Sequence, residues 1–340
     1  MLSAIVIVGP ENQCDERCAD TAGKLLPTVN SGERGTPLVY VEVLGRSVIE
    51  RLIDELQRGG VEKTSVYQGV AESSSFPDIH SASPIEFCSA ENAWTGAAER
   101  LAACKDSGAE ALVVARAAAY VELDLNDALQ FHREQAQAVT RAFDEEGPLD
   151  MWLIDPSRIS DDVDMLSEHR GAESARYFVR GYVNRLRHPG DLRRLAVDGL
   201  TARCGLRPKG TESRPGVWMY EGAQVHRDAR IVAPAFIGRG TRIAEQSLVT
   251  RCSNVESNCV IDYGTVVEDS SILSNTYVGI GLDVAHSIVD GNNLLNLERG
   301  VSMEIADPCV CRQNRLLRPG GNLRSPVSFG VGSAPLVQAE

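Results

Sequence analysis

Two pairs of cysteines have a spacing that could support metal or redox chemistry, Cys14-x-x-x-Cys18 and Cys309-x-Cys311. Thiolates are good zinc ligands, and neighbouring thiols can exchange disulfides. Neither pair, however, has a second pair at the spacing of a zinc site. The chain has nine cysteines and begins with a short apolar segment typical of a first strand rather than of an export signal. We therefore expect reduced thiols, no metal and a cytoplasmic location.

The composition excludes some classes of partner. A net charge of −13 repels phosphate backbones and anionic lipid surfaces, and no run of Lys or Arg interrupts it. We therefore expect neither nucleic acid nor a membrane as a partner, and no stretch reaches the roughly 18 apolar residues that span a bilayer. At 340 residues and 43% hydrophobic residues, the chain can form two domains with cores of their own.

An aliphatic residue recurs at every sixth position of the C-terminal third, and a small residue follows four positions after nearly every one. Two residue classes that share one period indicate a solenoid. Six residues make a strand and a turn, and three such units close a triangular coil. The aliphatic column is Val225, Ile231, Ile237, Ile243, Val249, Val255, Ile261, Val267 and Leu273.

This period predicts a left-handed parallel β-helix, as a domain over residues 223–307 that follows a linker at 208–222. The repeat is regular over 225–278. It loosens at Gly279-Ile-Gly281, where we expect the register to break, and a last irregular coil is predicted at 287–291. Residues 308–340, rich in Gly, Pro and Arg, are predicted to form an extended arm or a cap. Exposed helix ends and flat faces favour homo-oligomers formed through the β-helix.

Residues 1–207 alternate apolar strands with amphipathic helices, the pattern of an α/β domain with a mostly parallel sheet. Gly59-Gly60 ends the first helix, which carries Val48 and Leu56 on its apolar face. The predicted strands are 3–8, 64–67, 111–115, 138–143 and 151–154, and the later helices are 92–106, 125–134 and 191–202.

Several segments resemble the nucleotide-sugar pyrophosphorylase family, the sugar-1-phosphate nucleotidyltransferases that include mannose-1-phosphate guanylyltransferases. The stretch Thr36-Pro-Leu-Val-Tyr-Val-Glu-Val-Leu-Gly-Arg-Ser-Val-Ile-Glu is similar to the family's KPLxPVxGxPxIE segment. Gly181-Tyr182 and Pro189-Gly-Asp191-Leu192 resemble its GYWxDIGTPxDL segment. The resemblance implies a Rossmann-like nucleotidyltransferase sheet followed by the hexapeptide-repeat β-helix.

The phosphate-binding loop of this family departs from its pattern here. Family members have GxGTRL after the first strand, where glycines let backbone N–H groups approach the phosphates. This chain keeps Gly9 but continues with a proline and acidic residues, and Thr36 replaces the family's phosphate-contacting lysine. Lys24 is the nearest substitute. In the base-contacting segment Gly96 remains, whereas Trp94 would occlude the base, stack on a ligand or pack in the core.

Both positions that would carry the family's metal-binding aspartates are also altered. Asp124-Leu, followed by Phe131-His132, resembles another segment of the family, and counting back from Asp124 places the first at Ala118. Alignment from Gly181-Tyr182 and Pro189 places the second at Arg185. A guanidinium group at the second position adds positive charge where Mg²⁺ would lie. The resemblance thus implies a degenerate member with no cofactor and no catalytic residues.

We therefore expect a regulatory, nucleotide-sugar-sensing or scaffolding subunit, linked to nucleotide-sugar or polysaccharide metabolism. An active nucleotidyltransferase paralogue and a nucleotide sugar are its expected partners. The alternative is an active sugar-1-phosphate nucleotidyltransferase, which would need Mg²⁺ on other carboxylates. Glu122 and Asp124 are the candidates, although Asp124 better fits a helix N-cap. A third alternative is a hexapeptide acyltransferase, with His226 or His286 as general base.

Overall fold

The computed structural model describes residues 2–9, 37–69, 84–90, 93–106, 109–159 and 174–314. A seven-stranded mixed sheet, in the order β10-β8-β9-β6-β1-β4-β5, forms the first part of the chain. β9 runs antiparallel to β6 and β8, and the other neighbouring strands are parallel. The strands are β1 (Leu2–Val8), β4 (Lys63–Gly69), β5 (Ile85–Ala90), β6 (Ala111–Arg116), β8 (Val139–Asp144), β9 (Gly147–Ile154) and β10 (Ala175–Phe178).

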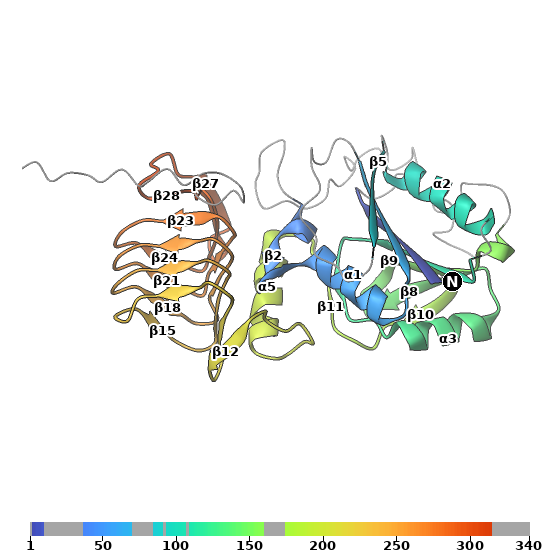
Figure 1. The fold of residues 1–340 in the computed structure, drawn as a ribbon, viewed down its shortest axis with the longest axis horizontal. Helices are drawn as coiled ribbons and strands as arrows, with labels where there is room; N and C mark the ends of the chain where they lie inside the picture. The colour runs from blue at the N-terminus through green and yellow to red at the C-terminus, as the bar shows by residue number, and fades with distance from the viewer. Residues whose placement is uncertain are drawn as a thin grey trace, which may run out of the picture.

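Helices cover both faces of this sheet (Figure 1). α1 and α3 pack against the face that carries Val6 and Val113, whereas α2 packs against the face that carries Ile5 and Val114. Among the helices described, none combines the length and the hydrophobicity that crossing a bilayer requires. The helices are α1 (Val48–Arg58), α2 (Ala93–Asp106), α3 (Leu125–Gln135) and α5 (Pro189–Leu200), with short 3-10 turns at η2 (Leu38–Tyr40) and η3 (Pro156–Arg158).

The predicted strands and helices of the sheet are confirmed to within a few residues. α1 begins in a capping box between Ser47 and Glu50 and ends at Gly59. The sequence did not predict β5 or β10. β5 alternates partly buried and exposed residues at the sheet edge, so it has no continuous apolar run. Two short pairs complete the domain, β2 (Glu42–Val43) with β3 (Arg46–Ser47) and β7 (Tyr120–Val121) with β11 (Val183–Asn184).

The C-terminal part is a stack of short parallel strands in three sheets, an arrangement that fits a β-helix. We call residues 217–290 the strand stack. The sheet nearest the first part of the chain is the docking sheet, formed by β13 (Val217–Met219), β16 (Ala235–Ile237), β19 (Asn254–Val255), β22 (Ser271–Ile272) and β25 (Ser287–Asp290). The other two contain β14 (Gln224–Val225), β17 (Arg242–Ile243), β20 (Val260–Ile261) and β23 (Thr276–Val278), and β15 (Arg230–Ile231), β18 (Leu248–Thr250), β21 (Val266–Glu268) and β24 (Asp283–Ala285).

The aliphatic column lies inside the strand stack, where it forms one core with the small residues of the turns. The members Ile231 to Val267 at every sixth position are at most 7% exposed. The seven residues are Ile231, Ile237, Ile243, Val249, Val255, Ile261 and Val267.

The prediction that Leu273 belongs to the aliphatic column is wrong. Val255 pairs with Ile272, not with Leu273, so this coil is one residue shorter than the coils before it. Leu273 instead packs against the first part of the chain. The register also does not break at Gly279, because the interior column continues from Val278 to Val284. A strict six-residue count does not detect the shorter coil, because a corner between two strands can lose a residue while the strands stay paired.

Antiparallel strands border the docking sheet at both ends. β12 (Thr211–Arg214) lies in the segment predicted as a linker and pairs with β13, which already belongs to the stack. After β25 the sheet continues through β26 (Asn293–Asn296) and β27 (Val301–Glu304). β28 (Cys311–Gln313) lies within the predicted arm, where it pairs with β23.

The docking sheet and the first part of the chain share one hydrophobic core. Phe236, Leu273 and Ile288 point out of the strand stack and belong to the same cluster as residues of α1 and α5. Figure 1 shows α5 and β2 between the seven-stranded sheet and the stack. Phe236 is fully buried there, against the turn at Gly45. Because the core is continuous, each part buries apolar surface of the other.

Charged groups are buried at the same interface. Oε1 of Glu256 accepts the backbone N–H of Leu44 at 2.8 Å, and Oε2 accepts that of Gly45 at 2.9 Å. On the other side, Nη1 of Arg193 in α5 donates to the carbonyl of Cys252 at 2.9 Å. Its Nη2 pairs with Asp269 at 2.8 Å. These contacts fix the β2–β3 turn and α5 against the stack.

Candidate functional site

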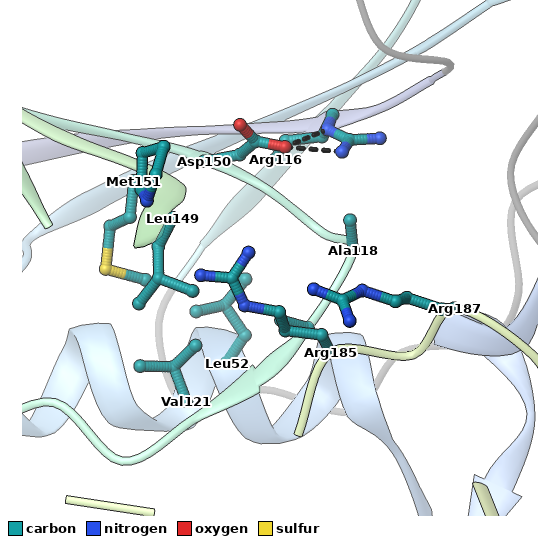
Figure 2. Close-up of a pocket in the computed structure, with 11 residues that line it drawn as sticks. Leu52, Arg116, Ala118, Val121, Leu149, Asp150, Met151, Arg185 and Arg187 are labelled. Atoms are coloured by element: carbon teal, nitrogen blue, oxygen red, sulfur yellow. Dashed lines mark hydrogen bonds and ion pairs between the residues drawn. The ribbon is translucent and has the colours of Figure 1, made fainter. Parts of the chain in front are cut away.

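A cavity of about 120 Å³ lies at the edge of the seven-stranded sheet where β6 ends and β9 begins (Figure 2). This is the carboxyl edge of the parallel strands, where open α/β sheets place their ligands. α1, β7 and the segment between β11 and α5 complete the wall. The lining residues are Leu52, Arg116, Ala118, Ala119, Val121, Pro148, Leu149, Asp150, Met151, Arg185 and Arg187.

Asp150 lies between two arginines from neighbouring strands. Nε of Arg116, on β6, donates to Oδ2 of Asp150 at 2.7 Å, and Nη2 of Arg116 pairs with the same oxygen. Nη2 of Arg141, on β8, lies 3.3 Å from Oδ1. Since β9 pairs with both β6 and β8, the sheet register itself brings these three side chains together. Both oxygens of Asp150 are thus engaged by guanidinium groups.

Arg185 and Arg187 enter the cavity from the segment between β11 and α5 (Figure 2). Asn184 holds the start of this segment in two ways. As part of β11 it pairs with Tyr120 of β7, and its side-chain Nδ2 donates to the carbonyl of Asp191 at 3.0 Å. Nε of Arg185 donates to Asp144 at 2.9 Å, and its Nη2 donates to the carbonyl of Gly147. Nη2 of Arg187 pairs with Glu146 at 2.8 Å.

The pair formed by Arg185 and Asp144 is ionised at neutral pH. Burial alone would raise the pKa of Asp144, but the hydrogen bond and the positive charge of Arg185 outweigh it, so the pKa lies below its usual value. The same hydrogen bond raises the pKa of Arg185, against the lowering effect of burial. Arg185 therefore keeps a fixed positive charge in the cavity wall.

The structure brings Ala118 and Arg185 together. These two positions are 67 residues apart in sequence, and both line this cavity. Ala118 offers no ligand atom beyond its backbone, and Arg185 is a cation. No group of three metal-binding side chains occurs in the described part of the chain. The described side chains of this wall therefore do not fit Mg²⁺, which is held in proteins mainly by carboxylate oxygens, and they fit an oxyanion instead.

Three other predicted binding residues, Gly9, Trp94 and Gly96, lie in the described part of the chain and do not line this cavity. Gly9 follows β1 and is buried, and Lys24 lies outside the described residues. Trp94 is 6% exposed in α2 on one face of the sheet, with its ring 6.0 Å from that of Trp152. A side chain at Gly96 would lie 2.7 Å from the ring of Tyr67, so this glycine permits close packing of α2 on β4. Trp94 and Gly96 thus have packing roles.

The predicted alternatives for catalysis occupy other places. Asp124 is the N-cap of α3, where it accepts the backbone N–H groups of Asn126 and Asp127, so the capping interpretation is confirmed. Oε1 of Glu122 accepts the hydroxyl of Tyr120 at 3.1 Å. His226 and His286, the two histidines considered for acyl transfer, do not line the cavity. They lie at turns of the strand stack that follow β14 and β24.

Six described cysteines carry free thiols, namely Cys88, Cys204, Cys252, Cys259, Cys309 and Cys311. Cys311 is buried on β28 and Cys309 is exposed, whereas Cys14 and Cys18 lie outside the described residues.

Sequence reasoning missed most of the charged wall. The sequence did not predict four of its charged residues, because each is of a type common in strands and loops. They are Arg116, Asp144, Asp150 and Arg187. The alternation Arg185-x-Arg187 was a usable signal, since two arginines two residues apart in a loop can point the same way. The pairing of β9 with β6 and β8 could not be deduced from it.

No protein-family model matches this chain, and no curated protein matches it.

Proposed function

We propose that this chain is a nucleotidyltransferase-like protein that has lost metal-dependent transfer and acts as a regulatory or assembly subunit. The observation that carries the proposal is that Ala118 and Arg185, which replace the family's two metal-binding aspartates, line the same cavity. Transfer of a nucleotidyl group needs a cation to neutralise charge between phosphates. Of the described residues lining the cavity, Asp150 alone is a carboxylate, and both of its oxygens already bind arginines.

The fold supports the resemblance on which this proposal rests. We propose that the first domain is Rossmann-like, because β5, β4, β1 and β6 are adjacent in the order of doubly wound nucleotide-binding sheets. We also propose that the strand stack is a left-handed β-helix, because three sheets of short parallel strands follow from a six-residue period.

A role in assembly is supported by the way the two parts are joined. The shared core through Phe236 and Leu273 makes the strand stack a fixed extension of the sheet domain rather than a tethered module. We propose that the stack's remaining faces pair with a second copy or with an active paralogue in nucleotide-sugar or polysaccharide metabolism. The exposed free thiol of Cys309 suits the reducing conditions of the proposed cytoplasmic location. Measurement of the mass in solution tests the homo-oligomer.

The loss of catalysis is tested by a pyrophosphate-release assay. The full chain is incubated with sugar 1-phosphates, each of the nucleoside triphosphates and Mg²⁺, beside an active sugar-1-phosphate nucleotidyltransferase as positive control. We expect no release above the rate without protein. Release that scales with protein concentration and stops on addition of EDTA would contradict the proposal.

A further inference from the structure

We propose that the cavity beside Ala118 binds a single phosphate group directly through its arginines, without a divalent cation. The inference rests on the proposed function, because it treats this cavity as a binding site that has replaced a catalytic one. It adds the class of ligand, a phosphate-bearing small molecule, and the residues that hold it.

The local charge favours an anion although the whole chain carries −13. Four guanidinium groups, those of Arg116, Arg141, Arg185 and Arg187, meet three carboxylates here, those of Asp144, Glu146 and Asp150. Among the described residues of this cluster, guanidinium groups therefore outnumber carboxylates by one. The side chains of Arg116 and Arg185 are 14% and 20% exposed, so water screens their attraction for an anion only in part.

The three lining arginines keep hydrogen-bond donors available. Asp150 engages Nε and Nη2 of Arg116, and Asp144 engages the same two atoms of Arg185. Glu146 engages Nη2 of Arg187. Within the described chain, no residue accepts a hydrogen bond from Nη1 of these three side chains. Figure 2 shows the guanidinium groups of Arg185 and Arg187 below Ala118, whose side chain is a single methyl group.

The size of the cavity limits the ligand to one anionic group. Pockets for drug-sized ligands measure about 300–1,000 Å³, whereas this one measures about 120 Å³. Leu52, Val121 and Leu149 supply an apolar side, which strengthens electrostatic attraction by excluding water. A phosphate monoester carries nearly two negative charges and three acceptor oxygens, so it matches adjacent guanidinium groups better than a carboxylate does.

The test measures phosphate binding in the presence of EDTA. Calorimetric titration and thermal shift of the full chain are run with inorganic phosphate, a hexose 1-phosphate and a nucleoside diphosphate, at matched ionic strength. We expect saturable binding that weakens as KCl is added. The tightest of the three ligands identifies what carries the phosphate group.

Arg187→Gln is the decisive variant, with Arg133→Gln as its control. Arg187 pairs with Glu146 at 2.8 Å, with exposures of 60% and 62%, and Arg133 pairs with Glu110 at 2.8 Å, with exposures of 62% and 64%. The two substitutions thus remove equivalent surface ion pairs. We expect Arg187→Gln to weaken binding at least about tenfold, the loss of one charge-assisted hydrogen bond, and Arg133→Gln to leave it unchanged.

Glu146→Gln gives an opposite expectation. It removes the carboxylate that competes for Arg187, so phosphate should bind a few-fold more tightly. Absence of binding by all three ligands, equal binding by Arg187→Gln, or binding only when Mg²⁺ is added would overturn the proposal. Its failure is separate from that of the proposed function, because pyrophosphate release is measured with Mg²⁺ and phosphate binding without it.

Discussion

Charged side chains have different surroundings at the cavity and at the interface between the seven-stranded sheet and the strand stack. At the cavity, Arg185 and Arg187 pair with carboxylates and remain 20% and 60% exposed. At the interface, Glu256 is fully buried and Arg193 is 5% exposed, and both bind backbone groups of the opposite part. The interface charges hold two segments of the fold in place, whereas the proposed role of the cavity arginines is to bind a ligand.

The largest expected effect is at the apolar centre of the interface. Phe236→Ala should lower the free energy of unfolding by about 3–5 kcal/mol, because it removes a fully buried ring and leaves a cavity. Urea denaturation measures this. Tyr263→Ala is the control, an aromatic residue 44% exposed on the outside of the strand stack, and should change stability by no more than about 0.5 kcal/mol. A loss below about 1 kcal/mol for Phe236→Ala would show that the two parts do not share a core.

The next effect is the pH dependence that Glu256 gives to stability. Burial, followed by repulsion from Glu42, raises the pKa of Glu256 from 4.5 to about 7, despite three hydrogen bonds that favour its charged form. Between these values the folded state binds more protons than the unfolded state, so the free energy of unfolding falls as the pH rises, by about 3 kcal/mol in all.

Glu256→Gln removes this titration and keeps the shape of the side chain. Urea denaturation of both proteins from pH 4.5 to 8 should show the stability advantage of the natural chain decreasing up to about pH 7 and then levelling. The difference between the two proteins cancels the histidines that titrate in the same range. A difference that does not vary with pH would show that Glu256 has the same pKa in the folded and unfolded states, and the contrast with the cavity would weaken.

The smallest expected effect is at the cavity. Arg187→Gln should change the free energy of unfolding by less than about 1 kcal/mol, because an ion pair between side chains 60% and 62% exposed is largely screened by water. Thermal melting without phosphate measures this. A larger loss would mean that Arg187 supports the fold, and its charge would then belong with those of the interface.

The parts of the fold that follow from local periodicity could be predicted. The interior residues from Ile231 to Val267 share one environment in every coil, so a six-residue count finds them. The count fails at Leu273, where the residue is equally apolar but faces the other part of the chain. A sequence shows that a residue is apolar, but it does not show which of two cores the residue joins.

The candidate site was predictable only in part for a related reason. The resemblance points to Ala118 and Arg185, and these positions do line one cavity. Asp150 and Arg141 depend on strand pairing between distant segments, and that pairing is fixed by tertiary packing. Trp94 and Gly96 were weighed as ligand contacts because the family uses that segment, whereas here they pack α2 onto the sheet.

The shortened corner before Ile272 has a consequence for how such a molecule can change over generations. In an ordinary sheet, loss of one residue from a strand turns every later side chain to the opposite face. Here the loss falls in a corner, next to Asp269, and the strands on both sides keep their partners. Single insertions and deletions at corners can therefore move the outer side chains relative to α5 while the interior stays the same. Natural variation or protein engineering can therefore change the outer surface of the stack one residue at a time.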